Sequence, residues 1–196
     1  MKQKGVPIAM ITAYDFSMAR LMDGAGVDVI LVGDSASNVM AGHETTLPIT
    51  LDQMIFLAGS VVRGSSCALV VVDLPFGTYQ GNSKGALNSA IRIMKESGGH
   101  AVKLEGGAEV IDSVERILTA GIPVMGHLGL TPQTATKLGG FKAQGRTATQ
   151  AVQLYEDALA LQSAGCFALV LEAVPTPVAA EITRAKTVYD RYKKMI

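Results

Sequence analysis

The sequence has few cysteines, no tryptophan and no excess of charge of either sign. Its 196 residues include two cysteines, Cys67 and Cys166, and its 17 basic residues balance 17 acidic ones. Two cysteines without CxxC spacing exclude a disulfide-rich scaffold and favour buried free thiols in a reducing compartment. Balanced charge without a basic stripe gives no electrostatic basis for binding nucleic acid or anionic membranes.

Long apolar runs are also absent, although 48% of the residues are hydrophobic and the mean hydropathy is +0.31. A membrane-spanning helix needs about 20 consecutive apolar residues, and no stretch of this chain approaches that length. The apolar content therefore belongs in a core or in an oligomer interface. Because the N-terminus enters an apolar strand without a signal-peptide core, we expect a cytoplasmic protein with no membrane or nucleic-acid partner.

Six short apolar runs recur along the chain, and each ends in a polar or ionisable residue followed by a turn. They lie at residues 10–15, 30–35, 70–73, 102–107, 124–127 and 169–172. Such runs are typical of parallel strands that helices cover on both faces. Helical spacing of apolar residues occurs at 16–25, 51–63, 83–97 (with Ser83 as the expected cap), 109–120, 148–164 and 177–184. The pattern predicts six βα units in one domain, residues 1–196.

Repeated β-α alternation implies a parallel sheet, either open or closed into a barrel. A doubly wound sheet binds its ligand at one switch point, whereas a barrel gathers every strand end around one mouth. Polar residues at successive strand ends favour the barrel, and no GxGxxG or P-loop string follows any strand. An eight-stranded barrel usually needs about 250 residues. We therefore expect the seventh and eighth units to be missing or incomplete, and residues 186–196 to form a polar helix.

Three carboxylates, Asp34, Asp73 and Glu105, close three successive predicted strands. Carboxylates gathered at one mouth repel one another unless a cation neutralises them, and Mg²⁺ is typically held by one or two carboxylates with substrate oxygens and water. Each of these residues taken alone could be a cap or a turn residue. Asp73, however, precedes Leu74-Pro75 rather than a helix that it could cap. The three together predict a divalent cation site.

Other ionisable residues lie at the same strand ends. Lys103 and Glu105 are two residues apart and share a face of one strand, where a buried charged pair is costly unless it contacts a ligand or metal; a structural ion pair is the alternative. Glu172 ends an apolar run, so desolvation should raise its pKa and make it a better base near neutral pH, unless it is a helix cap. His127 could polarise a carbonyl or be structural.

Two polar, glycine-rich segments, residues 41–48 and 130–146, are too polar for the core. Loops that cover a barrel mouth have this composition, since binding residues concentrate on loops held by a rigid scaffold. Solvated connectors are the competing interpretation.

Several short sequence strings are specific enough to indicate a protein family. Seven strings follow one another along the chain: Ile11-Thr12-Ala13-Tyr14-Asp15, Val32-Gly33-Asp34-Ser35, the string from Gly42 to Pro48, Asp73-Leu74-Pro75-Phe76, Val102-Lys103-Leu104-Glu105-Gly106-Gly107, Gly126-His127-Leu128-Gly129-Leu130-Thr131-Pro132-Gln133 and Leu169-Val170-Leu171-Glu172. Together they closely resemble the ketopantoate hydroxymethyltransferase family over about residues 5–185. The resemblance implies a (β/α)8 TIM barrel of the phosphoenolpyruvate/pyruvate superfamily.

The resemblance also implies an activity and its residues. Members of the family use Mg²⁺ and 5,10-methylenetetrahydrofolate to add a hydroxymethyl group to 3-methyl-2-oxobutanoate, giving ketopantoate for pantothenate synthesis, and they form large homo-oligomers (decamers). The matching positions are Asp34, Asp73 and Glu105 at the metal, with Glu105 acting through water; Asp34, Ser35, Asp73, Lys103 and His127 at the keto acid; and Glu172 as the catalytic base.

The C-terminal part departs from the family pattern. The family continues into a glycine-rich seventh strand and an eighth βα unit, which this sequence does not show, so we expect a truncated barrel. Two other functions stay open on the residues alone. One is a related metal-dependent lyase or aldolase acting on an oxoacid at the same metal site. The other is a catalytically inactive truncated barrel whose exposed edges drive association.

Overall fold

Six parallel strands form the centre of the molecule. The computed structural model describes residues 1, 4–135 and 140–184. The strands are β1 (Met10–Thr12), β2 (Val29–Val32), β3 (Leu69–Asp73), β4 (Ala101–Glu105), β5 (Val124–Gly129) and β6 (Ala168–Glu172). Their order in the sheet is the order of the sequence, β1-β2-β3-β4-β5-β6, and each pairs in parallel with the next. Sequential parallel pairing is the topology of a (β/α) barrel.

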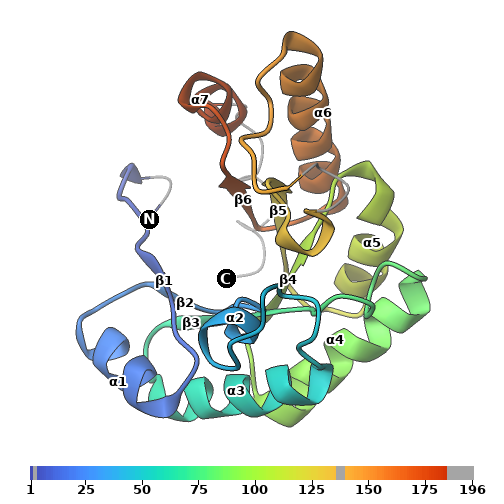
Figure 1. Ribbon diagram of the computed structural model, residues 1–196. Coiled ribbons are helices and arrows are strands. Elements are labelled where there is room, and N and C mark those ends of the chain that lie inside the picture. The colour runs from blue at the N-terminus through green and yellow to red at the C-terminus, as the bar shows by residue number, and fades with distance from the viewer. Residues whose placement is uncertain (2–3, 136–139, 185–196) are drawn as a thin grey trace.

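The helices lie along the outside of this curved sheet. They are α1 (Phe16–Gly24), α2 (Ala36–Val39), α3 (Leu51–Gly64), α4 (Ser83–Ser97), α5 (Ile111–Thr119), α6 (Ala148–Ala164) and α7 (Thr176–Arg184), with short 3₁₀ turns η2 (Ala108–Val110) and η3 (Pro132–Thr134). Figure 1 shows α1, α3, α4, α5 and α6 following one another around the strands, with each packed on the next. The described residues thus form a half-barrel of six βα units, which confirms the predicted fold class.

Alternation along the strands divides the apolar side chains between two faces. One face packs against the helices through residues such as Ile30, Val70, Val102 and Val124. The other, inner face carries a smaller cluster built on Val29, Val71, Ala101 and Met125, with Leu31 and Val170 packed against it. The inner cluster is therefore a short apolar floor at the amino-terminal part of the strands, and it leaves their carboxyl ends to polar residues.

Several local expectations need correction. Asn82, not Ser83, caps α4, because the Asn82 side chain accepts a hydrogen bond from the backbone N–H of Gly85. The helix expected over 109–120 begins as the 3₁₀ turn η2 and becomes α-helical only at Ile111. The four-residue helix α2 was not predicted, and the helix expected over 186–196 lies outside the described residues. No helix in the described part of the chain is long and apolar enough to cross a membrane.

Asp23 ties the end of α1 to the start of β3. Its carboxylate accepts hydrogen bonds from the backbone N–H groups of Ser66, Cys67 and Ala68, at 3.0, 3.0 and 2.7 Å. These bonds favour the ionised form and lower the pKa of Asp23 from its ordinary value of 3.8.

We expect Asp23→Ala to lower the melting temperature by a few degrees at pH 7, because three backbone donors lose their acceptor. A carboxylate whose pKa is lower in the folded state stabilises the fold at pH values above its ordinary pKa. This stabilisation is lost as the pH falls through the pKa of the folded state. The difference from wild type should therefore shrink below about pH 4. Thermal melts between pH 3 and 7 measure it, with Asp112→Ala on the exposed face of α5 as the control. A pH-independent difference would contradict this account.

The two thiols differ in exposure, so the prediction that both are buried is wrong for Cys67. Cys67 is exposed in the connection before β3, whereas Cys166 is buried and its pKa is raised to about 12 by desolvation. We expect a thiol-specific chromogenic reagent at pH 8 to modify Cys67 quickly and Cys166 only after denaturation. Cys67→Ser should abolish the fast phase, and a fast phase that survives in this variant would contradict the structure.

Candidate active site

The inner face of the strands turns from apolar to ionisable at the carboxyl ends of the sheet. Asp73 lies two residues after Val71 on β3. Lys103 lies two residues after Ala101 on β4, and Glu105 lies two residues after Lys103. Met125 leads to His127, and Val170 leads to Glu172, in the same alternation. Because side chains two residues apart point to the same side of a strand, one face collects all of these groups. The sequence predicted this shared face for Lys103 and Glu105, and the structure confirms it.

Asp34, Asp73 and Lys103 form one side of the cluster. Asp73 and Lys103 are paired in register on adjacent strands, and the Lys103 Nζ lies 2.7 Å from Asp73 Oδ1. The backbone N–H of Asp34 donates to Asp73 Oδ2 at 3.1 Å. All three side chains are buried. The two aspartates predicted to share a cation are therefore neighbours at one end of the sheet.

His127 links the carboxylates of the other side. Its Nδ1 lies 3.4 Å from Glu105 Oε1, and its Nε2 lies 3.2 Å from Glu172 Oε2. His127 is buried, yet neither nitrogen has a well-aligned hydrogen-bond partner among the described residues. The imidazole therefore lies between two predicted functional carboxylates, with one ring nitrogen facing each.

Ser35 reaches the cluster from the residue after Asp34. Its Oγ lies 2.8 Å from the hydroxyl oxygen of Tyr14, which follows β1. Gly33 makes this approach possible, since a Cβ at that position would lie 2.8 Å from the Ser35 Oγ and 3.6 Å from Asp73 Oδ2. The structure thus brings together every site residue predicted from the sequence, and it adds Tyr14.

Gln133 and Tyr79 are two further members that the sequence reasoning missed. The Gln133 Nε2 donates to Asp34 Oδ2 at 2.8 Å, and the Gln133 backbone N–H donates to Glu105 Oε2 at 3.0 Å. The Tyr79 hydroxyl contacts Gln133 Oε1 at 2.7 Å. Gln133 ends a string already noted as distinctive, but Tyr79 carries no local signal, because it reaches the cluster only through the fold.

Burial and mutual repulsion shift the ionisation of these groups. Desolvation, followed by the neighbouring Asp73, raises the pKa of Asp34 to about 7. Burial alone would lower the pKa of Lys103, but Asp73, Glu105 and Asp34 outweigh it and raise that pKa. The cluster therefore holds more negative charge than its single buried lysine neutralises, which favours binding of a further cation.

The prediction that burial raises the pKa of Glu172 is wrong. Its side chain is 43% exposed because, among the described residues, β6 has a neighbouring strand on one side only. The close approach of His127 Nε2 to the Glu172 carboxylate outweighs desolvation and lowers the pKa of Glu172. Conversely, burial of His127 would lower its own pKa, but Glu105 and Glu172 outweigh this effect and raise it.

The donor set fits Mg²⁺ in its usual protein environment. No group of three or more His, Cys, Asp or Glu side chains in the described part of the chain is placed so that it could hold a metal ion. Mg²⁺ does not require such a group, since one or two carboxylates with water and substrate oxygens commonly hold it. Asp34 and Asp73 are the adjacent pair, and Gln133 connects Asp34 to Glu105.

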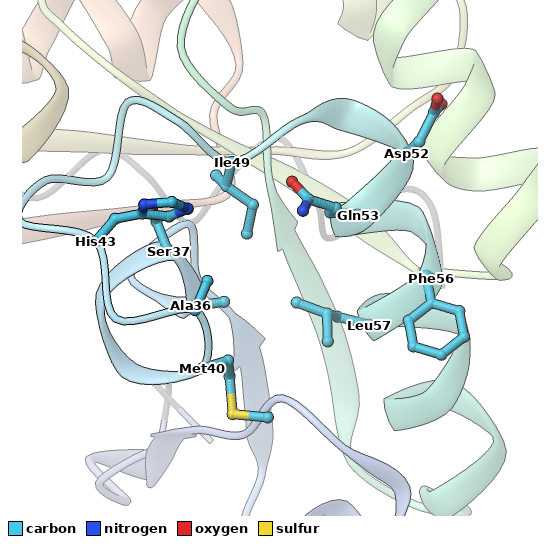
Figure 2. Close-up of a pocket in the computed structure, with 10 residues that line it drawn as sticks. Ala36, Ser37, Met40, His43, Ile49, Asp52, Gln53, Phe56 and Leu57 are labelled. Atoms are coloured by element: carbon cyan, nitrogen blue, oxygen red, sulfur yellow. The ribbon is translucent and has the colours of Figure 1, made fainter.

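A second cavity, of about 350 Å³, lies between α2 and the start of α3 (Figure 2). Its wall is mainly apolar, and its polar residues are Ser37, His43, Asp52 and Gln53. Three of them bond elsewhere: Ser37 donates to the backbone carbonyl of Thr45, Asp52 pairs with Arg92, and Gln53 completes the cap of α3 with Thr50. None of the residues of the strand-end cluster lines it. The strand-end cluster is therefore the candidate active site.

Comparison with known proteins identifies the family of the chain. The sequence matches the family model described as Ketopantoate hydroxymethyltransferase over residues 1–189. The chain belongs to the ketopantoate hydroxymethyltransferase family. It is 64% identical over 188 residues to the 3-methyl-2-oxobutanoate hydroxymethyltransferase of Christiangramia forsetii and 62% identical to that of Salinibacter ruber. These matches cover 96% of this chain and 69% and 71% of those relatives, which confirms the family resemblance.

Solved structures of other proteins support the barrel fold of this chain. A putative phosphonomutase from Burkholderia cenocepacia superposes with a TM-score of 0.71 at 17% identity, over 91% of this chain and 74% of that one. A 2,3-dimethylmalate lyase, a member of the PEP mutase/isocitrate lyase superfamily, gives 0.67 at 15% identity, over 92% and 63%. Because the identity is low, these likenesses establish the barrel fold alone and nothing of the reaction.

The Asp73–Lys103 pair of this family member should be strongly coupled. Lys103→Met removes the buried cation from three carboxylates and should lower the free energy of unfolding by about 3–5 kcal/mol. Asp73→Asn alone leaves the Lys103 ammonium without its paired carboxylate. The loss in free energy of unfolding in the double variant should therefore be about 1–3 kcal/mol smaller than the sum of the losses in the two single variants. Urea unfolding measures the cycle. The exposed Arg92–Glu96 pair is the control and should couple weakly; additive effects at Asp73 and Lys103 would contradict the ion pair.

Proposed function

We propose that the strand-end cluster transfers a hydroxymethyl group from 5,10-methylenetetrahydrofolate to 3-methyl-2-oxobutanoate, giving ketopantoate for pantothenate synthesis. Family membership and the identity of the named relatives support this reaction. The observation that carries the proposal is the convergence of Asp34, Asp73, Lys103 and Glu172 at the carboxyl ends of four strands. In barrels of this kind the catalytic residues come from that end of several strands.

Asp34 and Asp73 are the residues that would hold Mg²⁺, with Glu105 connected through water. When bound, the cation supplies Lewis-acid polarisation of the keto oxygen. The Lys103 ammonium lies beside Asp73, and the Ser35 Oγ, on the residue after Asp34, contacts the Tyr14 hydroxyl. We propose that both donate hydrogen bonds to the substrate carboxylate and keto oxygen. Lys103 would thus share its charge between Asp73 and the oxygens of the keto acid.

Glu172 is the proposed base that accepts the proton from C3 of the keto acid. Its lowered pKa keeps it ionised at neutral pH, and His127 orients it through the contact between Nε2 and Oε2. Water releases the methylene carbon of the folate as formaldehyde, which breaks both of its C–N bonds and leaves the two nitrogens protonated as tetrahydrofolate. The carbanionic C3 then adds to the formaldehyde carbon, and the new alkoxide takes the proton that Glu172 removed to give the hydroxymethyl group.

A homo-oligomeric, cytoplasmic enzyme remains our prediction. Large apolar side chains are exposed on the outer helices, including Val39 on α2 and Phe56 on α3, at 66% and 71% of their surface. Such side chains suit an interface between copies of the chain. Sedimentation of the protein as a function of concentration measures this assembly.

The reaction is tested by exchange of the C3 proton of 3-methyl-2-oxobutanoate with deuterated solvent, followed by proton NMR with and without Mg²⁺. We expect Mg²⁺-dependent exchange by wild type, and a loss of about 100-fold or more in Glu172→Gln with Mg²⁺ binding retained. Glu181→Gln on α7 is the control, since that carboxylate is exposed and pairs with Arg184.

Wild-type exchange that needs no Mg²⁺, or exchange that persists in Glu172→Gln, would contradict the proposed roles. Addition of 5,10-methylenetetrahydrofolate should then convert the keto acid to ketopantoate. Cleavage of a carbon–carbon bond in an oxoacid without any folate requirement would instead assign the site to a lyase.

A further inference from the structure

Gln133 is the one described residue whose own atoms hydrogen-bond carboxylates from two different strand ends. Its side chain reaches Asp34, beyond β2, and its backbone N–H reaches Glu105, at the end of β4. The Nε2 also donates to the backbone carbonyl of Leu74, at 2.9 Å, just after β3. Gln133 is 5% exposed and therefore connects the ends of three strands from inside the cluster.

The orientation of the Gln133 amide is determined by its surroundings. The backbone N–H of Glu105 donates to the Tyr79 hydroxyl oxygen at 3.1 Å, so the hydroxyl hydrogen is free to point to Gln133 Oε1, 2.7 Å away. The Gln80 Nε2 donates to the same Oε1 at 2.8 Å. Two donors on the amide oxygen require that the amide NH₂ group face Asp34 and Leu74, because a flipped amide would set donor against donor.

This arrangement has a direct consequence for the two carboxylates. One oxygen of Asp34 and one oxygen of Glu105 are occupied by neutral donors, at 2.8 and 3.0 Å. Neutral donors hold the carboxylates in place without cancelling their charge. A second lysine in the same position would cancel part of that charge. The Asp34 carboxylate therefore keeps its other oxygen oriented for a cation, whereas the other oxygen of Glu105 faces His127 Nδ1, 3.4 Å away.

We infer that Gln133 is a positioning residue, oriented by Tyr79, that sets the spacing of the Asp34 and Glu105 carboxylates for a divalent cation and, through it, for the keto acid. This role rests on the proposed function for its substrate, but its geometry depends only on the described contacts. The residue acts through the carboxylates and does not itself touch the reacting atoms.

The first test replaces Gln133 with an isosteric side chain that has no donor. In Gln133→Met, Mg²⁺ affinity measured by calorimetry without substrate should fall about 10- to 100-fold, the range typical for groups that orient metal ligands. Mg²⁺-dependent C3 proton exchange should need correspondingly more Mg²⁺, and saturating Mg²⁺ should restore most of the rate. Gln162→Met, near the C-terminal end of α6 and away from the strand ends, is the matched control and should bind Mg²⁺ as wild type does.

A second variant covers the case in which Gln133→Met does not fold. Tyr79→Phe keeps the amide but removes the hydroxyl that orients it, so it should weaken Mg²⁺ binding in the same direction by a smaller factor. Circular dichroism and thermal melts without Mg²⁺ establish folding for each variant. A purely structural role would lower the melting temperature and leave the Mg²⁺ affinity of the folded protein unchanged.

The outcomes separate this inference from the proposed function. Wild-type Mg²⁺ affinity in folded Gln133→Met, or in Tyr79→Phe if the first variant does not fold, would overturn the inference alone. A wild-type chain that binds Mg²⁺ without exchanging the C3 proton would contradict the proposed function, while the affinity comparison would still decide the role of Gln133. A wild-type chain that binds no Mg²⁺ would overturn both.

Discussion

The concentration of carboxylates at one end of a parallel sheet is the constraint on which the site depends. Asp34, Asp73 and Glu105 are buried within one cluster, and Lys103 is the buried lysine among them. Burial makes each negative charge costly, and proximity makes the set costlier still. The raised pKa of Asp34 is the visible sign of that cost. A cluster of this kind is stable only with donors that restrain it, and it is poised to gain free energy from a cation.

The fold produces this concentration through alternation along its strands. The same face that buries Val71, Ala101 and Met125 carries Asp73, Lys103 and His127 two residues later. The apolar floor anchors the strands and excludes water from below, while the helices pack on the opposite face. Stability and chemistry are thus separated along each strand rather than between separate regions of the molecule, as is usual for barrels.

The sequence predicted the strands and most of the site because both are local. Apolar runs of four to six residues specify buried strands, and an ionisable residue at the end of each run is visible without knowledge of the fold. The pKa of Glu172 could not be predicted in this way. Its exposure depends on which strand lies beside β6, and no pattern within residues 169–172 contains that information.

The contacts of Tyr79 and Gln133 show a different limit. Tyr79 lies 54 residues from Gln133 in the sequence, and Asp34 lies 99 residues from Gln133, so only the packing of the βα units against one another brings them together. A tyrosine and a glutamine also carry no charge that would mark them as ligands. Yet neutral donors are what a crowded carboxylate site requires, because they fix geometry without neutralising the charge that attracts the cation. Residues of this kind are therefore found from the hydrogen-bond network, whereas the charged residues that they serve are found from the sequence.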